Sequence, residues 1–261
     1  MLQGVPDILA RIVEQKRAEL GGIAATREEL ERKAEAARAL RRDFAQALSS
    51  RPTAVIAEIK KSSPSRGLLA PDFRPAEIAR AYEQAGAAAV SVLTDAPNFE
   101  GSLDDLRAAR QAIAIPVLRK DFTIAREHVL EAAANGGDAI LLIAAILTDT
   151  ELRDFRELAE SFAMAALVEV HDGEELRRAA GSGARIIGVN NRDLRSFEVS
   201  LATSLRLAPL MPSGAIRVAE SGIHSAADVR SLKQAGYDAF LVGEHLMKAA
   251  DPGAALRELL A

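Results

Sequence analysis

The sequence predicts an α/β fold: a (β/α)8 TIM barrel, with residues 1–261 as a single domain and residues 1–50 as an N-terminal helical extension of it. From residue 54 onward, short apolar runs alternate with amphipathic helical segments. Such alternation favours parallel strands joined by right-handed helical crossovers. Roughly eight of these units in about 210 residues fit a closed barrel, a fold of typically about 250 residues. An open doubly wound sheet is the alternative, but it favours a G-x-G-x-x-G turn that this chain lacks.

The N-terminal extension is predicted to be helical. Apolar residues recur at helical spacing over residues 7–48, among many Arg, Lys and Glu. Gly21-Gly22 divides this region into two expected helices. We expect a charged extension that packs on the barrel.

Eight apolar runs are the predicted strands. They lie at residues 54–60, 88–94, 116–120, 139–143, 165–170, 185–190, 215–220 and 239–243. Helical patterns between them lie at residues 75–86, 126–136, 149–162, 173–181 and 226–236. The glycines that follow several of these helices fit left-handed C-caps: Gly86, Gly136, Gly183 and Gly236. Because the unit of helix, glycine and apolar run recurs, the chain shows a weak internal repeat of roughly 25 residues.

Composition argues against several classes of function. The chain is 49% hydrophobic and 27% charged, with a mean hydropathy of +0.03 and a formal charge of −4. An acidic balance, 4% aromatic residues and no Trp argue against nucleic-acid binding. With no Cys and four scattered His, neither a thiol nucleophile nor a zinc site is expected. Because the chain starts without a signal-peptide pattern and its longest apolar run is too short to span a bilayer, we expect a cytoplasmic protein without membrane contact.

Ionisable and amide residues stand at the ends of several predicted strands. They are Glu58, Lys60, Lys120, Glu169, Asn190 and Glu220, with Ser221 following the last. A half-exposed strand would leave such side chains in water, and a single one usually is solvated or ion-paired. In a barrel, however, catalytic groups lie at the strand ends. A ring that interleaves lysines with carboxylates can pair a lysine acid with a carboxylate base.

A candidate anion site follows the last two predicted strands. Ser221-Gly222 ends the seventh strand, and Gly243-Glu244 ends the eighth and opens a short helical stretch. Glycine lets backbone N–H groups approach an anion, and a helix start adds a favourable dipole. The loops after strands seven and eight are the usual phosphate site of this fold, although glycine at a strand end also serves turns.

Ten segments along nearly the whole chain carry a resemblance to one enzyme family. In order they are ILARIVEQKRAEL, DFAQAL, IAEIKKSSPSRG, SVLTDAPNFEGS, PVLRKDF, DAILLIAAIL, LVEVH, IGVNNRDLRSF, VAESGI and FLVGEHLM. Together they resemble the indole-3-glycerol phosphate synthase family of tryptophan biosynthesis. The resemblance implies a carboxy-lyase that converts 1-(2-carboxyphenylamino)-1-deoxyribulose 5-phosphate to indole-3-glycerol phosphate with loss of CO2 and water, and with no metal or cofactor.

The resemblance also implies roles for the strand-end residues. Lys120 is the expected general acid that protonates the ketone oxygen, and Glu169 is the expected base. Lys60 is expected to pair with the substrate carboxylate, and whether it is also the acid for dehydration stays open. Glu58 is expected to orient both lysines. Asn190 and Glu220 are expected to position hydroxyls and intermediates.

Further residues are expected to bind the phosphorylated small-molecule substrate. Those near the phosphate are Ser63, Ser221, Gly222, Gly243 and the backbone of Glu244. Those expected around the anthranilate ring or elsewhere on the substrate are Pro64, Phe99, Leu141, Leu194, Leu241 and, near the rim, Arg192. We expect a monomer.

Two alternatives have different consequences. Phosphoribosylanthranilate isomerase is also a phosphate-binding barrel, but it uses a Cys base with an Asp acid, and this chain has no Cys. A catalytically silent barrel could bind phosphorylated ligands or a protein, but here both the lysine and the glutamate positions are filled.

Overall fold

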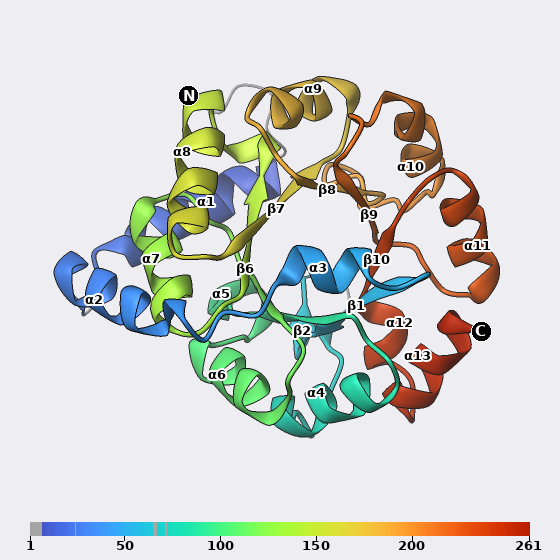
Figure 1. The fold of residues 1–261 in the computed structure, drawn as a ribbon, viewed down its shortest axis with the longest axis horizontal. Helices are drawn as coiled ribbons and strands as arrows, with labels where there is room; N and C mark the ends of the chain where they lie inside the picture. Colours follow the sequence, from blue (N-terminus) through green and yellow to red (C-terminus); the bar gives the residue numbers. More distant parts are fainter. Residues whose placement is uncertain (1–6, 24, 65–66, 71) are drawn as a thin grey trace.

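The chain forms a closed barrel of eight parallel strands surrounded by helices (Figure 1). This computed structural model describes residues 7–23, 25–64, 67–70 and 72–261. The strands pair in chain order and close through β1 and β10, which confirms the predicted (β/α)8 fold. The strands are β1 (Ala54–Ile59), β4 (Ala89–Leu93), β5 (Val117–Lys120), β6 (Ala139–Ile143), β7 (Ala165–Val170), β8 (Ile186–Asn190), β9 (Ile216–Glu220) and β10 (Ala239–Val242). Each predicted apolar run contains one of them.

The strands read as nearly continuous apolar runs because both of their faces are covered. All six residues of β1 are buried, and so are all residues of β4, β6, β8 and β10. One face packs inside the barrel and the other packs under the helices, as in parallel sheets generally. A charged side chain inside such a strand is therefore conspicuous. Glu58 of β1 is only 4% exposed, so the reading of a half-solvated strand is wrong.

Helices cover the outside of the barrel (Figure 1). Those that the sequence predicted are α4 (Pro75–Gln84), α7 (Arg126–Ala134), α8 (Asp149–Ser161), α9 (Gly173–Gly181) and α11 (Ala226–Gln234). Those that it did not single out are α6 (Leu103–Ala112), α10 (Ala202–Leu207) and α13 (Pro252–Leu260). The four predicted glycine C-caps are confirmed, because Gly86, Gly136, Gly183 and Gly236 all have φ between 81° and 99°.

Short elements occupy the loops. They are the hairpin β2 (Ser62–Ser63) with β3 (Gly67–Leu68), α5 (Ala96–Phe99), the 3-10 turns η1 (Ala144–Ile146) and η2 (Ala208–Leu210), and α12 (Glu244–Met247). The hairpin, α5, η1 and α12 directly follow barrel strands. They therefore lie at the end of the barrel where a catalytic site is expected. In the described part of the chain, a helix with the length and apolar character needed to cross a bilayer is absent.

The N-terminal extension has three helices rather than the two predicted. They are α1 (Asp7–Leu20), α2 (Arg27–Arg38) and α3 (Phe44–Ser49). The extra break was missed because it contains no glycine: the side chain of Asp43 caps α3 by accepting a hydrogen bond from the Gln46 N–H at 2.8 Å. Fully buried Phe44 and Leu48 of α3 pack at the N-terminal end of the barrel, where α3 contacts β1.

Helix α1 belongs to the opposite end of the barrel. Its Lys16 is 4% exposed, and the ammonium lies 3.0 Å from Asp95 Oδ2 and 2.9 Å from Asp121 Oδ1. Asp95 follows β4 and Asp121 follows β5, so the ion pairs bind α1 to two strand ends. Leu9 and Val13 of α1 share one apolar cluster with the strands. We therefore propose that extension and barrel form a single domain.

Lys16→Ala is expected to lower the free energy of unfolding by about 3 kcal/mol, because removal of one partner leaves buried charge uncompensated. Arg119 still pairs with Asp121, at 3.0 Å, but Asp95 Oδ2 loses its cation. Urea denaturation followed by circular dichroism measures the change. Arg27→Ala is the control, because its ion pair with Glu31 is solvent-exposed and such pairs contribute little. Equal losses in the two variants would contradict the structural role of Lys16.

Candidate active site

A cavity of about 410 Å³ opens at the C-terminal ends of the barrel strands. Its wall contains every residue that the sequence predicted for catalysis or substrate binding: Glu58, Lys60, Ser63, Pro64, Phe99, Lys120, Leu141, Glu169, Asn190, Arg192, Leu194, Glu220, Ser221, Gly222, Leu241, Gly243 and Glu244. The strand ends thus bring together residues that are far apart in the sequence. Their roles are a separate question, which depends on the geometry of the charged groups.

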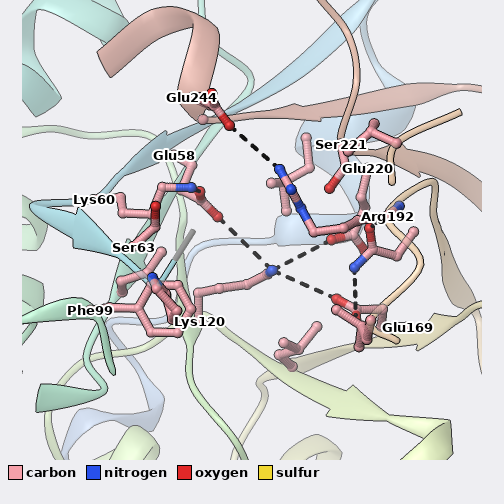
Figure 2. A pocket seen from close by; sticks show the side chains of 18 of the residues that line it. Glu58, Lys60, Ser63, Phe99, Lys120, Glu169, Arg192, Glu220, Ser221 and Glu244 are labelled. Atoms are coloured by element: carbon pink, nitrogen blue, oxygen red, sulfur yellow. Dashed lines mark hydrogen bonds and ion pairs between the residues drawn. The ribbon is translucent and has the colours of Figure 1, made fainter. Parts of the chain in front are cut away.

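The ammonium of Lys120 lies among three carboxylates (Figure 2). Lys120 Nζ is 3.6 Å from Glu169 Oε2, 3.6 Å from Glu220 Oε2 and 3.9 Å from Glu58 Oε2. The carboxylate side chains are 6% exposed or less, and Lys120 is 15% exposed. The four groups come from β1, β5, β7 and β9, and only a closed barrel brings these strands to one point.

The four groups shift one another's pKa in opposite directions. Burial lowers the pKa of Lys120, but Glu169, Glu220 and Glu58 outweigh it and raise the pKa above its ordinary value. Burial raises the pKa of Glu169, but the charge of Lys120 opposes it and the pKa falls to about 2. Burial also raises the pKa of Glu58, but the charges of Lys60 and then Lys120 outweigh it and lower the pKa. Burial and the charge of Glu169 raise the pKa of Glu220 to about 8. Lys120, together with Lys60, therefore keeps Glu169 and Glu58 ionised, while Glu220 holds a proton at neutral pH.

Glu220 is the least compensated member of this group. Its side chain is 1% exposed, and in the described part of the chain neither of its oxygens has a hydrogen-bond partner. At 3.6 Å, the contact with Lys120 is an ion pair without a hydrogen bond. A carboxyl group in this state can donate one hydrogen bond and accept others, so it can hold a hydroxyl group that enters the cavity.

Two glycines create the space that the carboxylates occupy. A Cβ atom at Gly188 would lie 2.1 Å from Glu220 Oε1, and one at Gly243 would lie 2.2 Å from Glu58 Oε1. Both distances are far below van der Waals contact, so a larger residue would displace the carboxylate. Glu58 also accepts a hydrogen bond from Lys60 Nζ at 2.7 Å, which holds this second ammonium at the cavity wall.

The end of the cavity after β9 and β10 has the predicted glycines. Ser221 and Gly222 both have positive φ, 67° and 76°, and a Cβ at Gly222 would lie 2.6 Å from Val199 Cγ1. Gly243 caps α12 with its backbone. The guanidinium of Arg192 adds positive charge here and lies 3.4 Å from Glu244 Oε2 (Figure 2). Arg192 was expected at the rim and lines the cavity.

The wall also contains residues that the sequence did not predict. Ile8, Leu9 and Ile12 of α1 reach the cavity, so the extension does more than pack on the barrel. Their helical spacing was visible, but spacing does not show which face of a barrel a helix covers. Phe122 is the second residue after β5, and its ring centroid lies 6.3 Å from that of Phe99. The remaining unpredicted wall residues are Leu93, Asp121, Ile143, Phe197, Val199, Ile223, His224, Val242 and His245.

The donor set does not suit a metal ion. In the residues that the structure describes, groups of three or more His, Asp or Glu with a geometry that could hold a metal are absent. The carboxylates of the cavity converge on an ammonium group instead.

Solved structures that are similar to this chain support the barrel fold. Thiamine phosphate pyrophosphorylase from Pyrococcus furiosus is 20% identical with a TM-score of 0.60, and the match covers 82% of this chain and 95% of that one. KGPDC from Streptococcus mutans is 13% identical with a TM-score of 0.61, and the match covers 79% of this chain and 94% of that one. At these identities the likeness shows the fold alone.

Sequence relatives are much closer. A protein of Albidiferax ferrireducens named indole-3-glycerol phosphate synthase is 50% identical over 260 residues, which cover 98% of each chain. A protein of Koribacter versatilis with the same name is 54% identical over 207 residues, 79% of this chain and 80% of that one. The sequence profile of the family described as indole-3-glycerol phosphate synthase matches residues 9–259. On these matches, the chain belongs to the indole-3-glycerol phosphate synthase family, whose members are enzymes of tryptophan biosynthesis.

Proposed function

We propose that the protein closes the indole ring of 1-(2-carboxyphenylamino)-1-deoxyribulose 5-phosphate and releases indole-3-glycerol phosphate, CO2 and water. One observation supports the proposal above the others: the ammonium of Lys120 lies 3.6 Å from the carboxyl groups of both Glu169 and Glu220, in the wall of a cavity that also contains Lys60. This arrangement supplies an acid, a base and a carboxylate anchor, and the reaction needs all three.

Ring closure requires a proton at the ketone oxygen. The aromatic carbon that bears the carboxylate attacks the ketone carbon, a C–C bond forms, and the oxygen becomes a hydroxyl group. Lys120 is the proposed donor, because the surrounding carboxylates keep it charged and hold it in place. Lys60, fixed by Glu58 at 2.7 Å, is proposed to pair with the substrate carboxylate until CO2 leaves and its electron pair restores the aromatic ring.

Dehydration then requires a base and an acid. The hydroxyl group leaves as water after it takes up a proton, and the adjoining CH2 group loses a proton. Glu169 is the proposed base because it stays ionised beside Lys120. Either lysine can supply the proton to the leaving hydroxyl. Asn190, which donates a hydrogen bond to Glu169 Oε1 at 3.1 Å, and the protonated Glu220 are proposed to hold hydroxyl groups of the intermediates.

The remaining cavity residues are proposed to bind the two ends of the substrate. Backbone groups of Gly222, Gly243 and Glu244, with Ser63 and Ser221, would hold the phosphate, because most of them follow β9 and β10, where this fold usually binds phosphate, and Gly243 opens helix α12. The apolar wall, formed by Pro64, Phe99, Leu141, Leu194 and Leu241, would enclose the aromatic ring, with Arg192 near the mouth. That the enzyme is a cytoplasmic monomer without a nucleic-acid partner stays a prediction.

The proposed reaction is tested by incubation of the purified protein with the carboxyphenylamino substrate. Indole fluorescence is expected to appear in step with release of CO2. Phosphoribosylanthranilate, the substrate of the isomerase, serves as the parallel assay and is expected to be left unchanged. Phosphate-dependent thermal stabilisation without turnover of either substrate would support a barrel that only binds ligands.

Lys120→Ala is expected to lower kcat by about 10²–10⁴-fold, the range for a lost general acid. Lys233→Ala is the matched control, because Lys233 lies on α11 outside the cavity and its ammonium contacts Thr53. Circular dichroism before the assay checks that both variants are folded. Near-normal kcat in folded Lys120→Ala protein would remove Lys120 from the mechanism.

Glu220→Gln is expected to stabilise the protein at alkaline pH. Because the folded pKa of Glu220 is raised, the carboxyl group adds stability below its unfolded pKa of about 4.3, and this stability is lost as the pH rises toward about 8. Gln stays neutral, and Lys120 keeps two carboxylates. At about pH 8.5 the variant is expected to exceed the wild-type free energy of unfolding by more than about 1.4 kcal/mol, the equivalent of one pKa unit.

Denaturant unfolding at several pH values measures this difference, which is expected to close toward about pH 5, near the unfolded pKa. Glu35→Gln, at an exposed position of α2, is the control for the loss of one negative charge. A difference that does not depend on pH would contradict the raised pKa of Glu220.

A further inference from the structure

His171 lies directly behind the proposed base. It is the first residue after β7, two positions after Glu169, and its side chain is 16% exposed. Its Nε2 atom is fully buried and lies 3.4 Å from Glu169 Oε1, on the side away from Lys120, which faces Oε2. His171 is not among the residues that line the cavity, so it can act on a substrate only through Glu169.

A second carboxylate holds the other side of the imidazole ring. Glu175 of α9 accepts two hydrogen bonds through Oε2, from the backbone N–H of His171 at 2.8 Å and from Nδ1 at 3.0 Å. The local sequence produces this contact. Asp172 caps α9 by accepting a hydrogen bond from the Glu175 N–H at 2.9 Å, which turns the first helical turn back toward the end of β7.

The imidazole therefore has a carboxylate oxygen at each ring nitrogen. A neutral ring has one nitrogen that must accept a hydrogen bond, whereas an imidazolium donates from both. Two acceptors fit the imidazolium. Burial lowers the pKa of His171, but Glu169 and Glu175 outweigh it and raise the pKa to about 10. In the described part of the chain Nε2 has no hydrogen-bond partner, so its contact with Glu169 Oε1 at 3.4 Å is an ion pair alone.

The charge of His171 affects both glutamates of the acid–base group. The groups around Glu169 are His171 directly after its own strand, Lys120 from β5 and the Asn190 amide from β8. The carboxyl groups of Glu58 from β1 and Glu220 from β9 also interact with it. Both cations favour the ionised form of Glu169, and His171 also opposes the raised pKa of Glu220. Because the Asn190 amide and His171 both hold Oε1, the Oε2 atom is left toward Lys120 and the cavity.

We propose that His171 is a positioning residue for the base: anchored by Glu175, it remains an imidazolium, holds one oxygen of Glu169 and leaves the other oxygen facing the reacting atoms. The inference rests on the proposed function because that function makes Glu169 the base. The charge state and contacts of His171 do not depend on it. Its test therefore has one part without catalysis and one part with it.

The first part is a ¹⁵N NMR titration of the histidine rings in the folded protein. The chain has four His, so the loss of one ring signal in a His171→Gln variant assigns His171, and a His128→Gln variant assigns His128 in the same way. His171 is expected to show two protonated ring nitrogens at neutral pH and to titrate near pH 10. His128 is the internal contrast, because burial and Arg119 lower its pKa to about 4 and it should be neutral in the same spectrum. A neutral His171 ring at neutral pH would overturn the inference.

Glu175→Gln tests the anchor. It is expected to lower the pKa of His171 by about one unit or more, the usual effect of removing an opposite charge at this distance. Glu174→Gln is the matched control, since Glu174 is on the same helical turn but is exposed and pairs with Arg177. Equal titration of His171 in both variants would contradict the role of Glu175.

The second part measures kinetics. His171→Gln keeps an amide donor near Nε2 but removes the charge, and it is expected to lower kcat about tenfold, equivalent to 1.36 kcal/mol. KM should change little, because the side chain lies outside the cavity. The loss should grow toward acid pH, because Glu169 with Lys120 as its remaining cation takes up a proton more readily. A loss that is equal at all pH values, or that falls on KM alone, would show a structural role only.

The outcomes separate the two proposals. Wild-type turnover together with a neutral His171 leaves the proposed function intact and removes the positioning role. Absence of wild-type turnover removes the proposed function, and the titration alone then decides whether His171 is an imidazolium. If His171→Gln does not fold, Glu175→Gln and the wild-type titration still give an answer.

Discussion

The site depends on one electrostatic constraint: a single buried ammonium cannot neutralise three buried carboxylates. Ionisable groups that are removed from water must be paired with an opposite charge or become neutral. Lys120 lies within 4 Å of all three carboxyl groups. The constraint is met because two of the carboxyl groups are ionised and the third is protonated. Glu58 and Glu169 have further cations, Lys60 and His171, and stay ionised. In the described chain Glu220 forms an ion pair with the shared lysine alone, and it takes up a proton.

Glutamate residues thus have two charge states in one site, so the same residue type can act as a base at one position and as a hydrogen-bond donor at another. Groups whose surroundings push their pKa values apart can serve as acid and base at the same pH. Geometry maintains the difference. Gly188 and Gly243 present bare backbone to Glu220 and Glu58, and the carboxylates fit only because no Cβ stands in the way. The closed sheet then fixes the four strand ends, so the distances that set the pKa values do not depend on flexible loops.

The sequence shows the barrel and the strand-end residues well because both depend on short patterns. A strand buried on two faces reads as an apolar run, and Glu58 or Lys120 interrupts such a run visibly. Lys16 could not be predicted in the same way. It stands among Arg, Lys and Glu on a helix where a charged residue is usually exposed, and it becomes buried only because Asp95 and Asp121 arrive from distant strands. His171 stands close to Glu169 in the sequence, but its second partner, Glu175, is brought to it by the first turn of α9.

Two charged residues that the sequence patterns missed, Lys16 and His171, lie outside the cavity and support groups in its wall. Asp121 follows Lys120 directly and binds Lys16 at 2.9 Å, so α1 restrains the chain next to the proposed acid. His171 restrains the proposed base from the loop that follows β7. A lysine–carboxylate distance of 3.6 Å is useful only if neither partner can rotate away, because electrostatic stabilisation requires groups that are already in place. The extension and the β7–α9 turn thus both hold the acid–base residues in position, even though neither supplies the group that transfers a proton.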